Sequence, residues 1–123
     1  MESRYLFRAK RIDTGEWAEG YLVQTVESSY IVVPYKHSTI FGEGIVIEID
    51  PSTICQCTGY AGIYEKDIFQ WDDEMYVIEW SDYSLSWEAE AIGNTDSISL
   101  GEFEPDEIYA IGNTIDNPEL LEV

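Results

Sequence analysis

Apolar and polar residues alternate over short stretches along most of this chain, which is the pattern of strands with one buried face. Residues 85–92 show the alternation well, and turn-type residues such as Gly, Pro, Asn and Asp separate the stretches. We expect Ile45, Ile47 and Ile49 to face inward, and a short helical turn at residues 117–118. The strands that the pattern predicts are residues 4–12, 17–23, 30–35, 45–49, 54–58, 68–71, 75–80, 85–92, 98–103 and 108–111.

Closely spaced short strands with turns between them are typical of sandwiches and small barrels. The sequence therefore predicts a mainly β fold, in which short antiparallel strands form a compact barrel-like structure with at most short helical turns. The meander over residues 64–103 would suit an SH3-like barrel in the C-terminal half. A length of 123 residues fits a single domain over residues 1–123, with two subdomains expected at residues 1–55 and 56–123.

The two cysteines, Cys55 and Cys57, are separated by one residue. A disulfide across so short a loop would be strained, and a metal site would need further soft ligands that no other Cys supplies. We expect both thiols to be reduced and buried, as in a reducing cytoplasm. No apolar run approaches the roughly 18 residues of a membrane span, and the first residues lack an apolar signal stretch. These features predict a cytoplasmic protein with no membrane partner.

Charge changes this picture most, because the formal net charge is −19 and is unevenly placed. All six Lys and Arg lie within residues 1–66, whereas residues 67–123 contain acids and no Lys or Arg. Such a surface repels nucleic acid and anionic membranes and attracts basic proteins. Two interpretations stay open, a solubilising surface and a binding surface for a basic protein. A stripe of Arg4, Arg8 and Lys10 could also dock on the acidic half of a second copy, which would give a homo-oligomer.

Two groups of carboxylates could carry chemistry. Glu65 and Asp67 are spaced so that strand residues would share a face, as a pair working in acid–base catalysis would need. The alternative is that Asp67 hydrogen-bonds the amides of a turn. Asp72, Asp73 and Glu74 could hold Ca²⁺ or Mg²⁺ weakly, although they lack the spacing of a dedicated loop and suit an exposed hairpin turn equally well.

Aromatic residues gather in the strands expected between residues 68 and 92. Exposed on one face they would make a stacking or peptide-binding surface, and buried they would fill the core. Trp71 and Tyr83 lie nearest to turns, so we expect these two to be exposed. The aromatic residues concerned are Trp71, Tyr76, Trp80, Tyr83 and Trp87.

Nothing else in the sequence has the pattern of an active site. His37 is the only histidine, and its neighbour Ser38 lies in the same expected loop, which predicts a solvated side chain rather than a catalytic set. Gly42 and Gly44 are not followed by the Lys and Ser or Thr of a phosphate loop. We therefore expect no catalytic residues, no metal and no cofactor.

Several phrases stand in a recognisable order along the chain. They are Phe7-Arg8-Ala9 followed by Trp17, Asp50-Pro51-Ser52-Thr53, Gln56-Cys57-Thr58-Gly59, Ile63-Tyr64-Glu65-Lys66-Asp67-Ile68, Ile111-Gly112-Asn113 and Asn117-Pro118-Glu119-Leu120-Leu121. Taken together and in this order, the phrases resemble the YopX family of phage and prophage proteins. Cys57 stands where the family usually has an aromatic residue, and Lys66 where it usually has Gly. The stretch between Gly59 and Ile63 is shorter than the family's usual turn.

The resemblance implies a β-rich fold and a phage or prophage gene, but no activity. With the acidic charge it favours a non-catalytic accessory protein that binds another protein, in a bacterial cytoplasm. One alternative is a DNA-mimic inhibitor of a DNA-binding host protein. Another is a metal-assisted hydrolase. The candidate binding residues are Glu65, Asp67, Trp71, Asp72, Asp73 and Tyr83.

Overall fold

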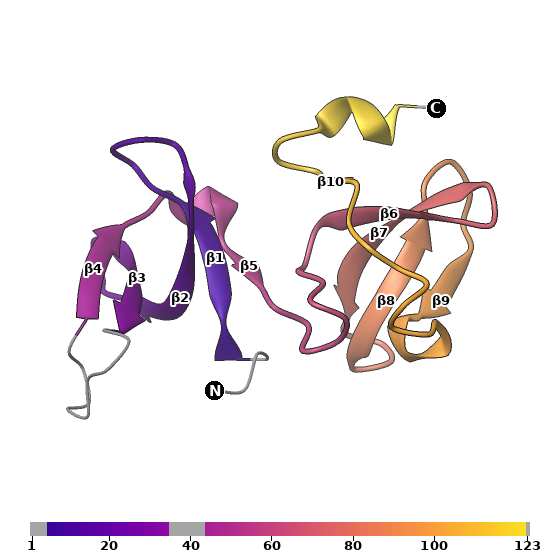
Figure 1. The fold of residues 1–123 in the computed structure, drawn as a ribbon, viewed down its shortest axis with the longest axis horizontal. Helices are drawn as coiled ribbons and strands as arrows, with labels where there is room; N and C mark the ends of the chain where they lie inside the picture. The colour runs from indigo at the N-terminus through magenta and orange to yellow at the C-terminus, as the bar shows by residue number, and fades with distance from the viewer. Residues whose placement is uncertain (1–4, 35–43, 123) are drawn as a thin grey trace. The chain divides into compact units, whose positions relative to one another are not determined.

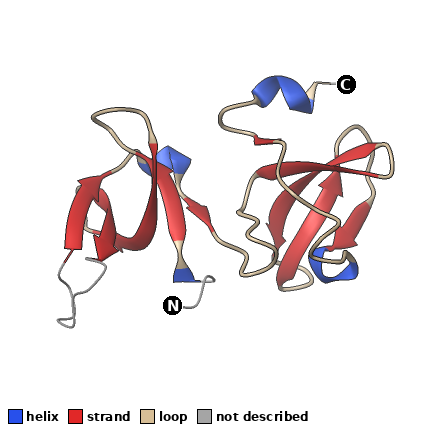
Figure 2. Cartoon of the chain, in the orientation of Figure 1, coloured by secondary structure: helices blue, strands red, loops and turns tan. Residues whose placement is uncertain are grey.

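The computed structural model describes residues 5–34 and 44–122, whose regular structure is mainly β-strand (Figures 1 and 2). The chain divides into two compact units, Met1–Cys57 (unit 1) and Thr58–Val123 (unit 2), each with one five-stranded sheet. Helical structure in the described residues consists of short 3-10 turns. The mainly β prediction is therefore confirmed, whereas the prediction of a single domain remains a prediction.

Unit 1 contains an antiparallel sheet in the order β4-β3-β2-β1-β5, with a single 3-10 turn, η2 (Pro51–Thr53), between β4 and β5. Its strands are β1 (Phe7–Lys10), β2 (Trp17–Gln24), β3 (Ser29–Pro34), β4 (Gly44–Glu48) and β5 (Cys55–Gln56). All five strands were predicted, within a few residues at each end. His37 and Ser38 lie outside the described residues, as does Arg4 of the basic stripe.

The core of unit 1 takes every second residue of its strands, as the alternation predicts. Ala9, Ile31 and Ile49 are fully buried or nearly so, and Ile47 packs against this cluster. Ile45 was also expected to face inward, and this is wrong, because its side chain is exposed. It lies at the outer end of β4, an edge strand with no neighbour on its far side in the described residues.

The unit 1 sheet curls at one end without closing. After β4 the chain forms an isolated antiparallel bridge between Ile49 and Arg11. The N–H of Ile49 donates to the carbonyl of Ser29 at 3.0 Å, and the N–H of Asp50 donates to that of Lys10 at 2.8 Å. These bonds connect the ends of β1 and β3, but β4 and β5 are not paired with each other in the described residues. The sheet is curved and open rather than a closed barrel.

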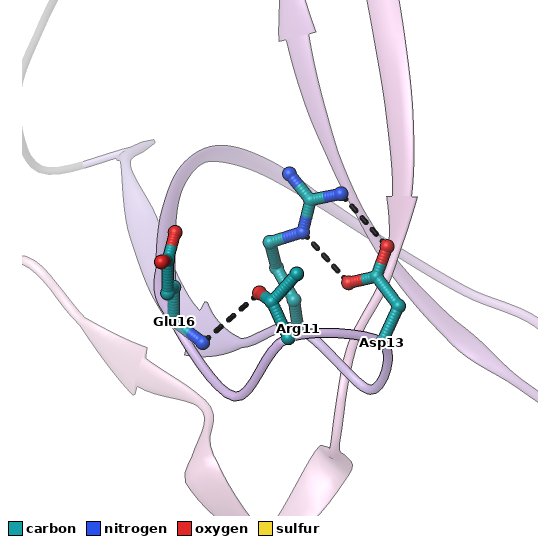
Figure 3. A network of polar contacts seen from close by, with 4 residues as sticks. Arg11, Asp13 and Glu16 are labelled. Carbon is teal, nitrogen blue, oxygen red and sulfur yellow. Dashed lines mark hydrogen bonds and ion pairs between the residues drawn. The ribbon is translucent and has the colours of Figure 1, made fainter.

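The β1–β2 connection is the turn that the sequence predicts, with Gly15 at φ +75°. Figure 3 shows the polar contacts of this turn. The guanidinium of Arg11 donates two 2.8 Å hydrogen bonds to the carboxylate of Asp13, and the N–H of Glu16 donates to the Thr14 hydroxyl at 3.2 Å. The Arg11 guanidinium holds the pKa of Asp13 below its ordinary value. The pair is open to solvent, so it adds little to stability.

Unit 2 contains an antiparallel sheet in the order β10-β6-β7-β8-β9 (Figure 1). Its strands are β6 (Asp67–Trp71), β7 (Glu74–Ser81), β8 (Ser86–Ala91), β9 (Ser97–Ser99) and β10 (Gly112–Asn113). Two 3-10 turns, η3 (Leu100–Glu102) and η4 (Pro118–Leu121), follow β9 and β10. The meander from β6 to β9 was predicted, and η4 begins after Asn117 as expected.

Two predicted strands of unit 2 are wrong. The strand expected over residues 98–103 ends at Ser99, because the chain turns into η3. Residues 108–111 form no strand, although the N–H of Ile111 donates to the carbonyl of Ile68 at 2.8 Å. The strand on this edge of β6 is β10. Apolar residues in both segments are nevertheless buried, since Phe103 and Ile108 fill the core from non-strand backbone.

Aromatic rings form the centre of the unit 2 core. Phe69 stacks on Tyr76 with ring centroids 5.5 Å apart, and the edge of Phe103 meets Phe69 at 5.2 Å. Such pairs contribute about 0.5–1.5 kcal/mol beyond the area they bury. Tyr76 was left open between core and surface, and the structure places it in the core.

Both cysteines of unit 1 are buried and form no disulfide, as predicted. Cys55 lies in β5, whose partner is β1, and Cys57 follows it, with its N–H donating to the carbonyl of Leu6 at 2.9 Å. They act as small apolar residues in the unit 1 interior.

Candidate functional site

The predicted carboxylate pair is divided by a turn. Asp67 begins β6 and is only 2% exposed, whereas Glu65 lies on the turn that precedes the strand. The expectation that both side chains share a strand face is therefore wrong. The Asp67 carboxylate accepts the N–H of Tyr64 at 2.8 Å, and the N–H of Asp67 donates to the Tyr64 carbonyl at 3.1 Å. This confirms the alternative, in which Asp67 hydrogen-bonds a turn amide.

Thr58, at the start of unit 2, is likewise engaged with backbone. Its hydroxyl donates to the carbonyl of Ile63 at 2.7 Å and accepts the N–H of Tyr60 at 3.1 Å. The Tyr60 hydroxyl in turn donates to the carbonyl of Phe103. The turn between Thr58 and Ile63 is thus fixed by side-chain hydrogen bonds to main-chain atoms.

The turn after β10 is also held by side-chain hydrogen bonds to main-chain atoms. The side-chain oxygen of Asn113 accepts the N–H groups of Ile115 at 3.0 Å and Asp116 at 2.8 Å, and the Asn117 side chain accepts the N–H of Asn113 at 3.2 Å. A Cβ on Gly112 would lie 2.6 Å from the Asn117 side-chain oxygen, so a larger residue here would displace the side chain that accepts the Asn113 N–H. These residues build a turn and leave no reactive group exposed.

In unit 1, the Asp50 carboxylate accepts the N–H of Ser52 at 3.0 Å and so caps η2. The neighbouring Thr53 hydroxyl accepts the N–H of Lys10 at 2.8 Å. These bonds connect the turn to β1, so Asp50 and Thr53 serve the fold.

Asp72 and Asp73 form the two-residue turn between β6 and β7. Both have positive φ, 51° and 66°, as a type I′ hairpin requires, and both side chains are exposed. The structure thus confirms an exposed hairpin turn. Throughout the described part of the chain, no group of three or more His, Cys, Asp or Glu is arranged to hold a metal ion.

Trp71 and Tyr83 were both expected to be exposed, but they differ in burial. Trp71 is half-buried, with its ring edge-on to Phe103 at 5.2 Å and its indole N–H donating to Glu107 at 2.9 Å. It packs against the core, and the expectation of an exposed Trp71 is wrong because Phe103 and Glu107, which follow η3, contact its ring. Tyr83 is fully exposed.

The end of the β7–β8 hairpin carries a cluster of exposed apolar side chains. Trp80 is 44% exposed, Leu85 is 71% exposed, and Tyr83 between them is fully exposed. Trp80 lies directly opposite Trp87, with ring centroids 5.3 Å apart and an interplanar angle of 76°. Trp87 in turn packs against the unit 2 core. We call Trp80, Tyr83, Leu85 and Trp87 the hairpin tip.

Carboxylates surround the hairpin tip. The indole N–H of Trp80 donates to Asp82 at 3.1 Å. Glu88 accepts hydroxyl hydrogen bonds from Ser97 at 2.6 Å and from Ser84 at 2.8 Å, and these bonds hold its pKa below the ordinary value. Glu88 therefore keeps its negative charge beside the tip well into the acidic range.

Glu79 faces Glu88 across the β7–β8 pair. Its pKa is raised, first by burial and then by the nearby charges of Glu65 and Glu90. Like charges opposite each other destabilise a sheet. Unit 2 thus concentrates negative charge on its central strands at a cost in stability.

Only part of this cluster was predicted from the sequence. Tyr83 was predicted as exposed because it lies in a turn, but Trp80 and Leu85 were assigned to strand faces by the alternation. Leu85 has φ +54° and belongs to the turn rather than to β8. The turn-type residues Asp82 to Ser84 are the signal that could have placed Leu85 in the loop. Together with Leu85 they make a four-residue hairpin loop, which is a common length.

Unit 1 has two shallow hollows of about 280 and 270 Å³, which share Ile12 and Glu48. Exposed aliphatic side chains, Val46 and Val26, line one hollow each. Both hollows are smaller than the usual small-molecule site of about 300–1,000 Å³. Among the described residues, no helix is long and apolar enough to cross a membrane.

Comparison with known proteins gives one match. The family model described as YopX protein matches residues 6–122, nearly the whole chain. No curated protein and no solved structure matches the chain.

Proposed function

The chain belongs to the YopX family, and from this premise we propose that it is a non-catalytic accessory protein of a phage or prophage. It binds a basic protein through the acidic surface of unit 2, in the cytoplasm of a bacterial host. The observation that carries this proposal is that unit 2 has a single base, Lys66, and that its acids lie almost entirely on the surface. Its exposed acids are Asp72, Asp73, Glu74, Asp82, Glu90, Asp96, Glu102, Glu104, Asp106, Glu107, Asp116, Glu119 and Glu122.

Solubility alone is a weaker explanation for this arrangement. A solubilising charge is most effective on a fully exposed side chain. Glu79 is half-buried, and its raised pKa reflects the free-energy cost of holding its charge there beside other carboxylates. Positive groups of a partner, brought against the same strands, would offset this repulsion and gain affinity from it.

The alternatives drawn from the sequence differ in what supports them. A DNA-mimic inhibitor is a special case of the same proposal, in which the basic partner is a DNA-binding protein. Homo-oligomer formation through the N-terminal basic stripe would use the same acidic surface. The metal-assisted hydrolase has no observation in its favour among the described residues.

Two matched charge variants test the proposal. The unit 2 variant carries Glu102→Gln, Glu104→Gln and Asp106→Asn. The unit 1 variant carries Glu16→Gln, Glu27→Gln and Glu48→Gln. All six side chains are exposed, and each variant lowers the net negative charge equally.

Tagged wild-type protein and both variants are incubated with bacterial lysate at low and high salt, and bound proteins are identified by mass spectrometry. We expect a basic protein that wild type and the unit 1 variant retain, that the unit 2 variant loses, and that high salt releases. Added DNA that displaces it would identify the DNA-mimic case. Equal retention by both variants would show that the charge of unit 2 is not the binding surface.

A further inference from the structure

We propose that the hairpin tip is an arginine-binding site, at which an arginine-bearing segment of the basic partner protein docks. This rests on the proposed function and goes further, because it assigns the contact to four named side chains and to one cation. The acidic surface would attract the partner over a distance, and the tip would hold it.

The composition of the tip is that of an interaction hot spot. Trp and Tyr dominate the energetics of protein interfaces, and they do so where a ring can be fully desolvated by the partner. Trp80, Tyr83 and Leu85 are exposed within six consecutive residues, at the end of a hairpin that is otherwise part of the core sheet. A partner that covers these side chains would remove their apolar area from water, which favours binding.

The tip is also held in place before any partner arrives. The Trp80 ring makes a T-shaped contact with the ring of Trp87, which packs against the core, and the Trp80 indole N–H donates to Asp82. Ser84 donates its N–H to the Ser81 hydroxyl at 3.2 Å, which closes the loop. A ring held in one orientation loses less entropy on binding than a free one.

Arginine is the cation that fits this chemistry best. A guanidinium stacks on the face of a Trp ring and can donate to a neighbouring carboxylate. Here Asp82 lies within hydrogen-bonding distance of the Trp80 ring edge, so one guanidinium can meet both groups. Lysine would gain the charge attraction but not the stacking or the two-pronged hydrogen bonds.

The chain itself shows the contact in unit 1. There the guanidinium carbon of Arg8 lies 4.7 Å from the ring centroid of Trp17, and the Lys10 ammonium lies 5.4 Å from it. Unit 2 holds no arginine, and its single base is Lys66, whose N–H donates to the carbonyl of Ile78 at 2.8 Å. An arginine for the tip therefore comes from outside unit 2, and we assign it to the partner.

The test uses short synthetic peptides and the full-length chain. One peptide carries several arginines, the second has lysine in their place, and the third has the neutral arginine analogue citrulline. Affinity is measured by isothermal titration calorimetry at low salt. The protein variants are Trp80→Ala and Tyr83→Ala, with Tyr109→Ala as the matched control, since Tyr109 is 73% exposed and lies in the same unit away from the hairpin.

We expect the arginine peptide to bind wild type more tightly than the lysine peptide, and the citrulline peptide not to bind. Trp80→Ala and Tyr83→Ala should each weaken arginine-peptide binding by about five-fold or more, whereas Tyr109→Ala should change it by less than about two-fold. Because Tyr83 is fully exposed, its variant will fold even if Trp80→Ala disturbs Trp87.

Other outcomes overturn the inference and separate it from the proposed function. Equal binding to all three variants would place the contact elsewhere on the acidic surface and leave the proposed function standing. Equal affinity for the arginine and lysine peptides would show that charge attraction alone binds the peptide, and would overturn the arginine site. If no peptide binds, the hairpin tip is not an arginine site. The proposed function is then still decided separately, by whether the unit 1 charge variant retains a basic protein from lysate and the unit 2 variant loses it.

Discussion

Replacing Asp67 by alanine is expected to destabilise unit 2 strongly. Its carboxylate is 2% exposed and accepts the N–H of Tyr64 at 2.8 Å, in the turn that leads into β6. β6 pairs with β7 on one side and β10 on the other, so the turn sets the register of a central strand. Tyr64 is itself buried, which leaves water poor access to its N–H once the carboxylate is removed.

The size of the effect follows from this bond and the burial. Hydrogen bonds to charged groups contribute about 1.5–3 kcal/mol to stability, and a buried donor left without an acceptor costs about 1–3 kcal/mol. Both ranges estimate the free energy lost when this one hydrogen bond is removed, so they are not added. We expect the free energy of unfolding of unit 2 to fall by about 2–3 kcal/mol.

Urea unfolding followed by tryptophan fluorescence measures the change, because Trp71, Trp80 and Trp87 all lie in unit 2. With a slope of about 1 kcal/mol per molar urea for a unit this small, the midpoint should fall by about 2–3 M. Asp106→Ala is the matched control, since Asp106 is an exposed aspartate of the same unit.

Asp67→Asn separates the hydrogen bond from the charge. The amide oxygen can still accept the Tyr64 N–H, so the loss should be smaller than that of Asp67→Ala. If Asp67→Ala unfolds within about 0.5 kcal/mol of wild type, as surface substitutions do, the argument from burial is refuted and the Tyr64 N–H must find another acceptor.

Three further changes test other parts of unit 2. Gly112→Ala should destabilise it by about 1–3 kcal/mol, because the new Cβ would lie 2.6 Å from the Asn117 side-chain oxygen, whereas Gly101→Ala meets nothing within 4 Å and should be neutral or stabilising in the same urea assay. Asp73→Gly should stabilise the β6–β7 hairpin by about 0.5–1 kcal/mol, because φ +66° suits glycine better than aspartate; an unchanged melting temperature would contradict this. Burial raises the pKa of Glu79, so the folded state holds that proton more tightly than the unfolded state, and stability falls as pH rises through the folded pKa. Glu79→Gln should therefore melt at a higher temperature than wild type near neutral pH, and this difference should shrink below the ordinary glutamate pKa; a difference that does not change with pH would refute the titration.

The alternation of apolar and polar residues predicted the strands well where strand and core coincide. β2, β7 and β8 were found within a residue or so of their expected ends, since each has one face on the core. Leu85 shows the limit, because it continues the alternation of β8 but has a left-handed backbone and lies in the loop. Local pattern does not reveal where a hairpin turns when an apolar residue closes the loop.

Pairings between distant segments were the least predictable. β10 is only Gly112 and Asn113, and it is a strand because β6 lies beside it. The apolar run 108–111, which was taken for a strand, instead sends Ile108 into the core from a loop. Such short edge strands carry no periodicity of their own, because their form depends on a partner far away in the sequence.

The burial of candidate site residues was equally non-local. Trp71 and Trp80 are both tryptophans close to a turn. Trp71 is the last residue of β6, and Trp80 is the next-to-last residue of β7. Trp71 is covered because Phe103 and Glu107 arrive from another part of the chain, while Trp80 lies beyond the last core residue of its strand. No property of the residues next to them in the sequence distinguishes the two.

The phrases that carry the family resemblance hold turns in place. Asp50, Thr58, Asp67 and Asn113 all direct a side-chain oxygen at main-chain N–H groups. Lys66, where the family usually has Gly, has φ +71°, a conformation that glycine adopts without strain. The phrases thus specify the fold, and a partner would be recognised by residues outside them. Trp80 and Tyr83 lie between the phrases, on a hairpin whose turn is free to vary without disturbing the bonds that the phrases make. Family membership therefore reports the scaffold, whereas the proposed choice of partner would depend on what the hairpin tip presents.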